Sequence, residues 1–123
     1  MPEVSEVKSV IVRPMQGVHV IKVRGKLALG CPPLLELRER LAELAEHGEF
    51  NWLLDLQEVN MLDSSGVGLL AQTMTSARNR QGACKLLNLQ KFPMQVLKMV
   101  SLLALFEVYD DLHTALESFS AKR

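Results

Sequence analysis

Runs of apolar and β-branched residues predict strands in the first quarter and in the middle of the chain. Residues 7–12 and 18–24 are rich in valine and isoleucine and are separated by Pro14 and Gly17. Short runs of this kind divided by proline and glycine indicate a hairpin. Residues 50–56 are almost continuously apolar, which is typical of a central strand covered on both faces.

Apolar residues three and four positions apart predict four helices in the remaining sequence. The expected segments are residues 34–46, 67–80 and 94–99, and a last helix after Asp111, which is expected to cap it. Pro32 and Pro33 favour the start of the first helix. The predicted inward stripes are Leu34, Leu37, Leu41, Leu44 and Ala45; Val67, Leu70, Ala71, Met74 and Ala77; Val96, Leu97 and Val100; and Leu112, Ala115, Leu116 and Phe119.

The order of these elements predicts an α/β fold. Residues 84–89 and 106–109 read as further strands, so strands and helices alternate after the hairpin. This order favours a mixed sheet of four to five strands with about four helices packed mostly on one face. A chain of 123 residues is expected to form a single domain, with its core at about residues 5–119.

Composition narrows the possible functions. The chain has 14 basic and 14 acidic residues, and this balance argues against a nucleic-acid partner. Cys31 and Cys84 form no Cys-x-x-Cys pair and there are only three histidines, so neither a metal site nor a cofactor is expected.

The longest apolar stretch, residues 99–106, is shorter than the roughly 20 residues of a membrane span, and the first residues do not resemble a signal peptide. A cytoplasmic protein without membrane insertion is the expectation.

The segment Asp63-Ser64-Ser65-Gly66 lies where the central strand ends and a helix begins. Side-chain oxygens at this position can accept hydrogen bonds from the free N–H groups of the first helical turn. The segment is therefore predicted to cap the helix.

The outward face of the helix at residues 67–80 is small, polar and uncharged. Most solvated helices of this length carry more charge, so this face is expected to meet a partner. It consists of Gly68, Gln72, Thr75, Ser76 and Asn79.

The sequence offers little for catalysis. Phosphate-binding loops, dinucleotide-binding glycines and a His-Glu-x-x-His motif are lacking. Ser64 lacks the Gly-x-Ser-x-Gly surroundings of a hydrolase nucleophile. Asp55 and Asp63 could form a carboxylate pair, but a hydrogen-bonded strand residue and a helix cap explain them equally well. The protein is not expected to be an enzyme.

The motif and its surroundings resemble the anti-sigma-factor antagonists and the wider STAS domain family. The resemblance covers almost the whole chain, from Gly25-Lys26-Leu27 in the early loop to residues 105–116 at its end. Its centre reads Trp52-Leu53-Leu54-Asp55-Leu56, then Val59, then Met61-Leu62-Asp63-Ser64-Ser65-Gly66-Val67-Gly68-Leu69-Leu70.

The resemblance implies a domain that binds a kinase-type anti-sigma factor, is phosphorylated by it on Ser64 and so regulates sigma-dependent transcription. A phosphatase is a further implied partner. Asp63 and Ser65 match the motif's acidic and second hydroxyl residues, and Gly66 matches the glycine that lets the partner approach. The early loop, with Lys26 and Ala28, is expected to contribute to the partner surface, although many antagonists have an acidic residue where Ala28 stands.

Two other functions fit the same resemblance. One is a scaffold subunit of a stressosome-like complex or a lipid transporter, and the other is a domain that binds a nucleotide or small ligand. The oligomeric state stays open.

A phosphate on Ser64 is compatible with the fold on physical grounds. It adds roughly 1.5 to 2 negative charges, which the N-terminus of a helix accommodates. Its expected effect is therefore on partner binding and not on folding.

Overall fold

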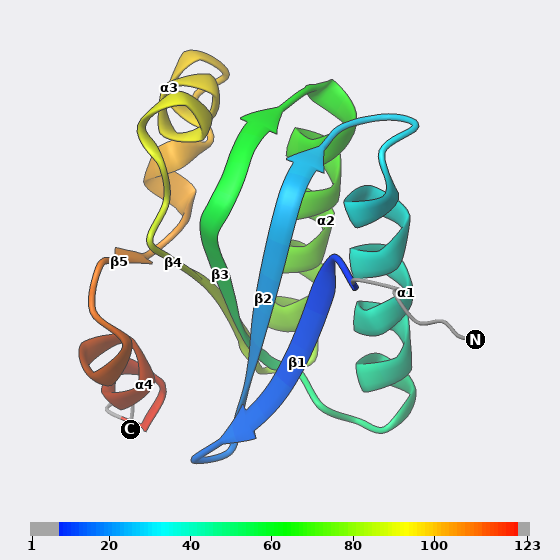
Figure 1. Ribbon diagram of the computed structural model, residues 1–123. Coiled ribbons are helices and arrows are strands. Elements are labelled where there is room, and N and C mark those ends of the chain that lie inside the picture. The colour runs from blue at the N-terminus through cyan, green and yellow to red at the C-terminus, as the bar shows by residue number, and fades with distance from the viewer. Residues whose placement is uncertain (1–7, 121–123) are drawn as a thin grey trace.

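A mixed five-stranded sheet forms the centre of the domain in a computed structural model that describes residues 8–120 (Figure 1). The five strands and four helices agree with the predicted fold class. Along the chain, the elements are β1 (Val10–Met15), β2 (Val18–Leu27), α1 (Pro32–Glu46), β3 (Asn51–Leu62), α2 (Ser64–Asn79), β4 (Ala83–Leu87), α3 (Lys91–Met99), a short 3-10 turn (Leu103–Leu105), β5 (Val108–Tyr109) and α4 (Leu112–Ser120).

The strands follow one another in the sheet in their order along the chain. β1 pairs antiparallel with β2, and all other neighbouring strands are parallel. Leu27, the last residue of β2, pairs with Leu62, the last residue of β3. The Asp63 segment therefore begins at the edge of the sheet where the parallel strands end, beside the loop that follows β2.

One face of the sheet carries the main core. Figure 1 shows α1 and α2 side by side over this face. Leu37 of α1, Leu70 of α2 and Leu97 of α3 are fully buried in the same cluster as the strand residues Leu54 and Leu86. The central residues of the predicted inward stripes thus form this core, but Val100, predicted to face inward, lies just after the end of α3 and is 49% exposed.

α4 covers part of the opposite face. Its Ala115 and Leu116 pack against Val20, Leu53 and Leu87 of the sheet. The capping role predicted for Asp111 is confirmed, since its Oδ2 accepts the backbone N–H of Thr114 at 2.8 Å and the Thr114 hydroxyl at 2.7 Å.

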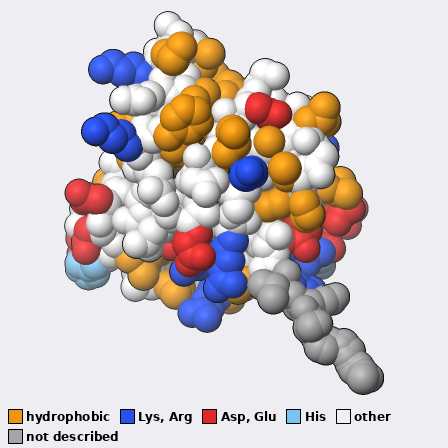
Figure 2. All heavy atoms as spheres, turned by 45° about the horizontal axis from the view of Figure 1, so that its top comes forward, with side chains coloured by type: hydrophobic (Ala, Val, Ile, Leu, Met, Phe, Trp, Pro, Cys, Tyr) orange, Lys and Arg blue, Asp and Glu red, His pale blue; other side chains and the backbone are white. Residues whose placement is uncertain are grey.

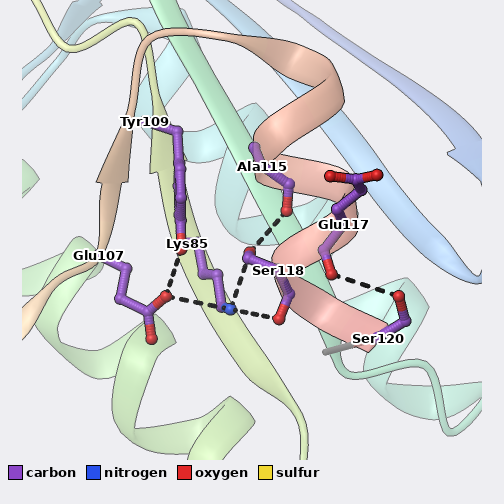
Figure 3. A network of polar contacts seen from close by, with 7 residues as sticks. All are labelled: Lys85, Glu107, Tyr109, Ala115, Glu117, Ser118 and Ser120. Atoms are coloured by element: carbon purple, nitrogen blue, oxygen red, sulfur yellow. Dashed lines mark hydrogen bonds and ion pairs between the residues drawn. The ribbon is translucent and has the colours of Figure 1, made fainter. Parts of the chain in front are cut away.

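Lys85 of β4 forms hydrogen bonds with α4 (Figure 3). Only 7% of this residue is exposed, yet its Nζ donates to Ser118 Oγ at 2.9 Å and to Ser118 O at 3.1 Å. It also lies 3.1 Å from Glu107 Oε1 and 4.7 Å from the centre of the Phe119 ring. A buried cation needs such partners to offset the loss of its hydration, so these contacts link Lys85 to α4 in addition to the apolar packing of that helix.

The hairpin differs from the sequence prediction in its strand boundaries. β1 continues through Pro14, which is permitted because β1 is the edge strand. β2 continues through Leu27, so residues 25–27, predicted as a loop, belong to a strand. The register shifts between Gly25 and Lys26, and Gly25 has a φ of +105°, a conformation that glycine adopts without strain. Residue 7, the predicted start of the first strand, lies outside the described residues.

Candidate functional site

Asp63 caps α2. It is the single residue between β3 and α2, and its backbone is extended, with φ −103° and ψ −172°. Its Oδ1 accepts the backbone N–H of Gly66 at 3.0 Å. The cap predicted from the sequence is confirmed, and the helix begins at Ser64, three residues earlier than its apolar pattern suggested.

The second carboxylate oxygen of Asp63 holds the loop between β2 and α1. Asp63 Oδ2 accepts the N–H of Leu29 at 2.9 Å, and the Asp63 N–H donates to the carbonyl of Leu27 at 3.4 Å. The hydrogen bond from Leu29, followed by that from Gly66, lowers the pKa of Asp63 below its ordinary value of 3.8. Near neutral pH the carboxylate is therefore ionised and joins the early loop to the start of α2.

Ser64 presents a hydroxyl to solvent at the first position of α2. The residue is exposed, and its side chain makes no hydrogen bond to any other residue from 8 to 120. Ser65 is half-buried. The cap is made by Asp63, so the Ser64 hydroxyl is free to react.

Gly66 is required by a contact within the domain. The residue is buried, and a Cβ added there would lie 2.1 Å from the carbonyl oxygen of Leu27 and 2.8 Å from Leu62 Cδ1. The sequence interpretation assigned this glycine to the approach of a partner. The structure shows a reason within the domain, which is the close packing of α2 on the end of β2, while the approach of a partner at this glycine stays a prediction.

The remaining residues predicted for partner binding lie on both sides of this junction. Lys26 is exposed and Ala28 is half-buried in the segment that Asp63 holds. Gly68 and Gln72 are exposed on α2, on the first and second turns after Ser64. The structure thus brings the early loop and the start of α2 together, whereas Gln72 lies further along the helix.

Exposed apolar side chains lie at the same edge of the sheet, and the sequence interpretation did not identify them. Leu29 in the early loop is 77% exposed, and Met61 at the end of β3 is 37% exposed. On α3, Phe92 is 51% and Met99 is 82% exposed. Figure 2 shows hydrophobic side chains gathered on the face that includes this edge. A large exposed apolar surface is typical of protein–protein contact sites.

The pH dependence of stability provides a test of the Asp63 cap. Because the folded state lowers the pKa of Asp63, the cap stabilises the domain above pH 3.8, and this contribution is lost as the pH falls through the lowered pKa. We expect Asp63→Ala to lower the melting temperature at pH 7 and to reduce the loss of stability between pH 5 and about pH 2. Thermal unfolding followed by circular dichroism at several pH values measures both effects.

Asp111 is a matched control, because it caps α4 in the same way and its pKa is also lowered, chiefly by Thr114. Both substitutions to alanine should destabilise the domain. Only Asp63→Ala should accelerate amide hydrogen exchange at Leu29. Equal exchange at Leu29 in the two variants would contradict the role of Asp63 in holding the early loop.

Other reactive groups are scarce. Burial raises the pKa of the Cys84 thiol to about 12, and both cysteines are free. Asp55 accepts hydrogen bonds from Gln57 N at 3.2 Å and Asn88 Nδ2 at 3.4 Å, as predicted for a strand residue. Across residues 8–120, no cluster of three or more His, Cys, Asp or Glu could hold a metal ion, and no helix is long and apolar enough to cross a membrane.

Comparison with solved structures shows the same fold in several bacterial proteins. A Thermotoga maritima protein is 19% identical with a TM-score of 0.83 over 90% of this chain and 94% of its own. An anti-sigma factor antagonist from Mycobacterium paratuberculosis is 22% identical with a TM-score of 0.76, over 90% and 92% of the two chains. The Bacillus cell fate determinant SpoIIAA in its phosphorylated form is 20% identical with a TM-score of 0.70, over 89% and 97%.

The sequence itself provides the family assignment. A search among curated proteins gives no match. The STAS domain pattern, in contrast, matches residues 9–115, which is most of the chain and includes every element of the site. The chain therefore belongs to the STAS domain family.

Proposed function

We propose that this protein is an anti-sigma-factor antagonist whose binding to a kinase-type anti-sigma factor is switched off by phosphorylation of Ser64. The observation that carries this proposal is the free, exposed Ser64 hydroxyl at the start of a helix that Asp63 already caps. A phosphatase that removes the phosphate would restore binding, and the cycle would regulate sigma-dependent transcription. The protein itself would perform no catalysis.

The position of Ser64 allows a phosphate without loss of the fold. The N-terminus of a helix carries a partial positive charge from its aligned peptide dipoles. Phosphate groups bind favourably there. Because Ser64 makes no side-chain contact that the fold requires, its modification breaks no hydrogen bond among the described residues.

The surroundings of Ser64 explain how a phosphate would weaken partner binding. Leu29 and Met61 expose apolar surface beside the motif, and Asp63 is already ionised. A partner that covers this surface would bury a dianion next to a carboxylate. Removing such charges from water without matching cations is strongly unfavourable. The phosphate would therefore act through charge at the interface.

The early loop would complete the partner surface. Asp63 holds Leu29 through a hydrogen bond of 2.9 Å, and Lys26 pairs with Met61 at the end of β3, so the end of β2 and the start of the loop lie beside the segment that leads to Ser64. Gly68 and Gln72 would extend the surface along α2. Ala28 carries no charge, so Lys26 at the end of β2 is the charged side chain that a kinase would meet on this side of Ser64.

The relatives support this proposal by their fold and by their printed functions. The Mycobacterium paratuberculosis protein is an anti-sigma factor antagonist, and the Bacillus protein is known in a phosphorylated form. Both share the arrangement of strands and helices that places Ser64 at the beginning of α2.

Phosphorylation by the cognate kinase tests the proposal. Incubation with ATP and the kinase-type anti-sigma factor of the same organism should add one phosphate group, detected by intact-mass spectrometry. Ser64→Ala should abolish the addition, because the accepting hydroxyl is lost. Ser65→Ala removes the neighbouring hydroxyl and should leave the addition at Ser64 intact.

Two results would contradict the proposal. One is an unmodified protein under conditions in which the same kinase phosphorylates another substrate. The other is unchanged phosphate incorporation in Ser64→Ala, which would place the modification on a different residue.

A further inference from the structure

A groove between α1 and α2 lies apart from the Ser64 junction. Its volume is about 420 Å³, which falls within the range of small-molecule sites. The floor is apolar and includes Leu41 and Ala45 of α1, Leu69 of α2 and Trp52 of β3. An apolar floor of this size excludes a small, fully hydrated ion and favours a ligand with a hydrocarbon part.

The wall formed by α2 offers hydrogen-bonding groups without charge. Gln72, Ser76 and Asn79 line the groove and are exposed. They belong to the small, uncharged helix face that the sequence singled out as a surface for a partner. Amide and hydroxyl groups of this kind can fix the orientation of a ligand without repelling either sign of charge.

The charged side chains that line the groove are both basic. Arg38 of α1 and Arg80 at the end of α2 are exposed, and neither forms an ion pair within the described part of the chain. The guanidinium carbon of Arg80 lies 5.0 Å from the centre of the Phe50 ring, a contact that orients the cation. No carboxylate lines the groove, so these two arginines are available to an anion.

We propose that the α1–α2 groove binds a single-chain anionic amphiphile, with its hydrocarbon chain on the Trp52 floor and its carboxylate or phosphate head at Arg38 or Arg80. Guanidinium groups bind such heads through charge-assisted hydrogen bonds. This ligand site goes beyond the proposed regulatory function and uses none of the residues that cap α2; Gln72 belongs both to the groove and to the proposed partner surface. It can therefore exist whether or not Ser64 is phosphorylated.

Trp52 provides a direct readout, because it is the only tryptophan of the chain and lies in the groove. A bromine atom on the hydrocarbon chain quenches tryptophan fluorescence at contact distance. Titration with 11-bromoundecanoate, kept below its micelle concentration, should quench Trp52 in a saturable manner. The neutral 11-bromoundecanol should bind about 10-fold more weakly, equivalent to about 1.4 kcal/mol, because it lacks the charge that the arginines recognise.

Substitutions in the groove distinguish recognition of the ligand's charged head by the arginines from nonspecific association of its hydrocarbon chain. The double variant Arg38→Gln/Arg80→Gln should weaken 11-bromoundecanoate binding about 10-fold or more. Arg78→Gln is the matched control, since Arg78 is an exposed arginine of the same helix that does not line this groove. Ser76→Phe should fill the groove and remove saturable quenching.

Several outcomes would overturn the proposal. Quenching by the alcohol as strong as by the carboxylate would show that the charge is not recognised. Unchanged affinity in the double arginine variant, or no saturable quenching at all, would do the same. Binding only to phosphatidylglycerol vesicles, measured by co-sedimentation, would assign the basic surface to membranes and not to a ligand in the groove.

Discussion

Replacing Gly66 by alanine is expected to destabilise the domain by about 3 kcal/mol. A Cβ at this position would lie 2.1 Å from the carbonyl oxygen of Leu27, which is a backbone atom and cannot rotate away as a flexible side chain could. α2 would have to shift away from the end of β2, and the hydrogen bonds of Asp63 to the early loop would be strained. Guanidinium denaturation followed by circular dichroism measures the change in free energy of unfolding.

Gly68 supplies the control, because it lies two residues further along the same helix. A Cβ added to Gly68 would have no neighbour within 4 Å. Gly68→Ala should therefore stabilise the domain by about 0.5–1 kcal/mol through the higher helix propensity of alanine. If both variants had wild-type stability, the close contact between α2 and β2 would be wrong.

Features that depend on neighbouring residues in the sequence could be predicted. Asp63 precedes a helix pattern and follows an apolar strand, so its capping role requires only the geometry of a helix N-terminus. The same reasoning identified Asp111 and the start of α1 at the prolines. The alternation of strands and helices was sufficient for the fold class, because parallel strands need helical connections.

Features that depend on strand register could not be predicted. The hydrogen bond between Asp63 and Leu29 joins residues 34 positions apart, and it requires β2 and β3 to end side by side. The need for glycine at position 66 has the same origin, since its neighbour is the carbonyl of Leu27. The sequence contained one usable signal for this neighbourhood. It is the segment Gly25-Lys26-Leu27, which forms the end of β2 directly before the loop.

Burial of polar residues was also missed. Thr73 is buried on α2 although the inward stripe was assigned to apolar residues, and its hydroxyl donates to the Leu69 carbonyl at 2.6 Å. Lys85 is buried because Ser118 and Glu107 of later segments supply its partners. In both cases the side chain's own partner removes the penalty of burial, and hydrophobic periodicity contains no information on such partners.

Ser64→Asp is expected to weaken binding of the kinase-type anti-sigma factor about 100-fold, equivalent to about 2.7 kcal/mol, while leaving stability almost unchanged. This prediction depends on the proposed function. An aspartate introduces one negative charge where a phosphate would introduce roughly 1.5 to 2. The new carboxylate would lie beside ionised Asp63 and would be buried by a partner that covers Leu29.

Stability should not fall, because a negative charge in the first turn of α2 interacts favourably with the helix dipole. The melting temperature of Ser64→Asp should lie within a few degrees of the wild-type value, as ΔΔG values below about 0.5 kcal/mol imply for a domain of this size. Calorimetric titration gives the affinity for the anti-sigma factor, and thermal unfolding of the same preparation gives the stability.

Gln81→Glu distinguishes a local effect from a general charge effect, because Gln81 is exposed just beyond the far end of α2 and does not belong to the helix face that is expected to meet a partner. It adds the same charge far from the junction and should change the affinity less than about 3-fold. An equal loss of affinity in both variants would show that the partner responds to the net charge of the domain. Unfolding of Ser64→Asp with unchanged affinity for the folded fraction would contradict the argument that the start of α2 accommodates an anion. A switch that acts by charge at the interface and leaves the fold intact requires two results together. Ser64→Asp must lose affinity for the partner while the control variant does not, and the stability of Ser64→Asp must stay close to that of the wild type.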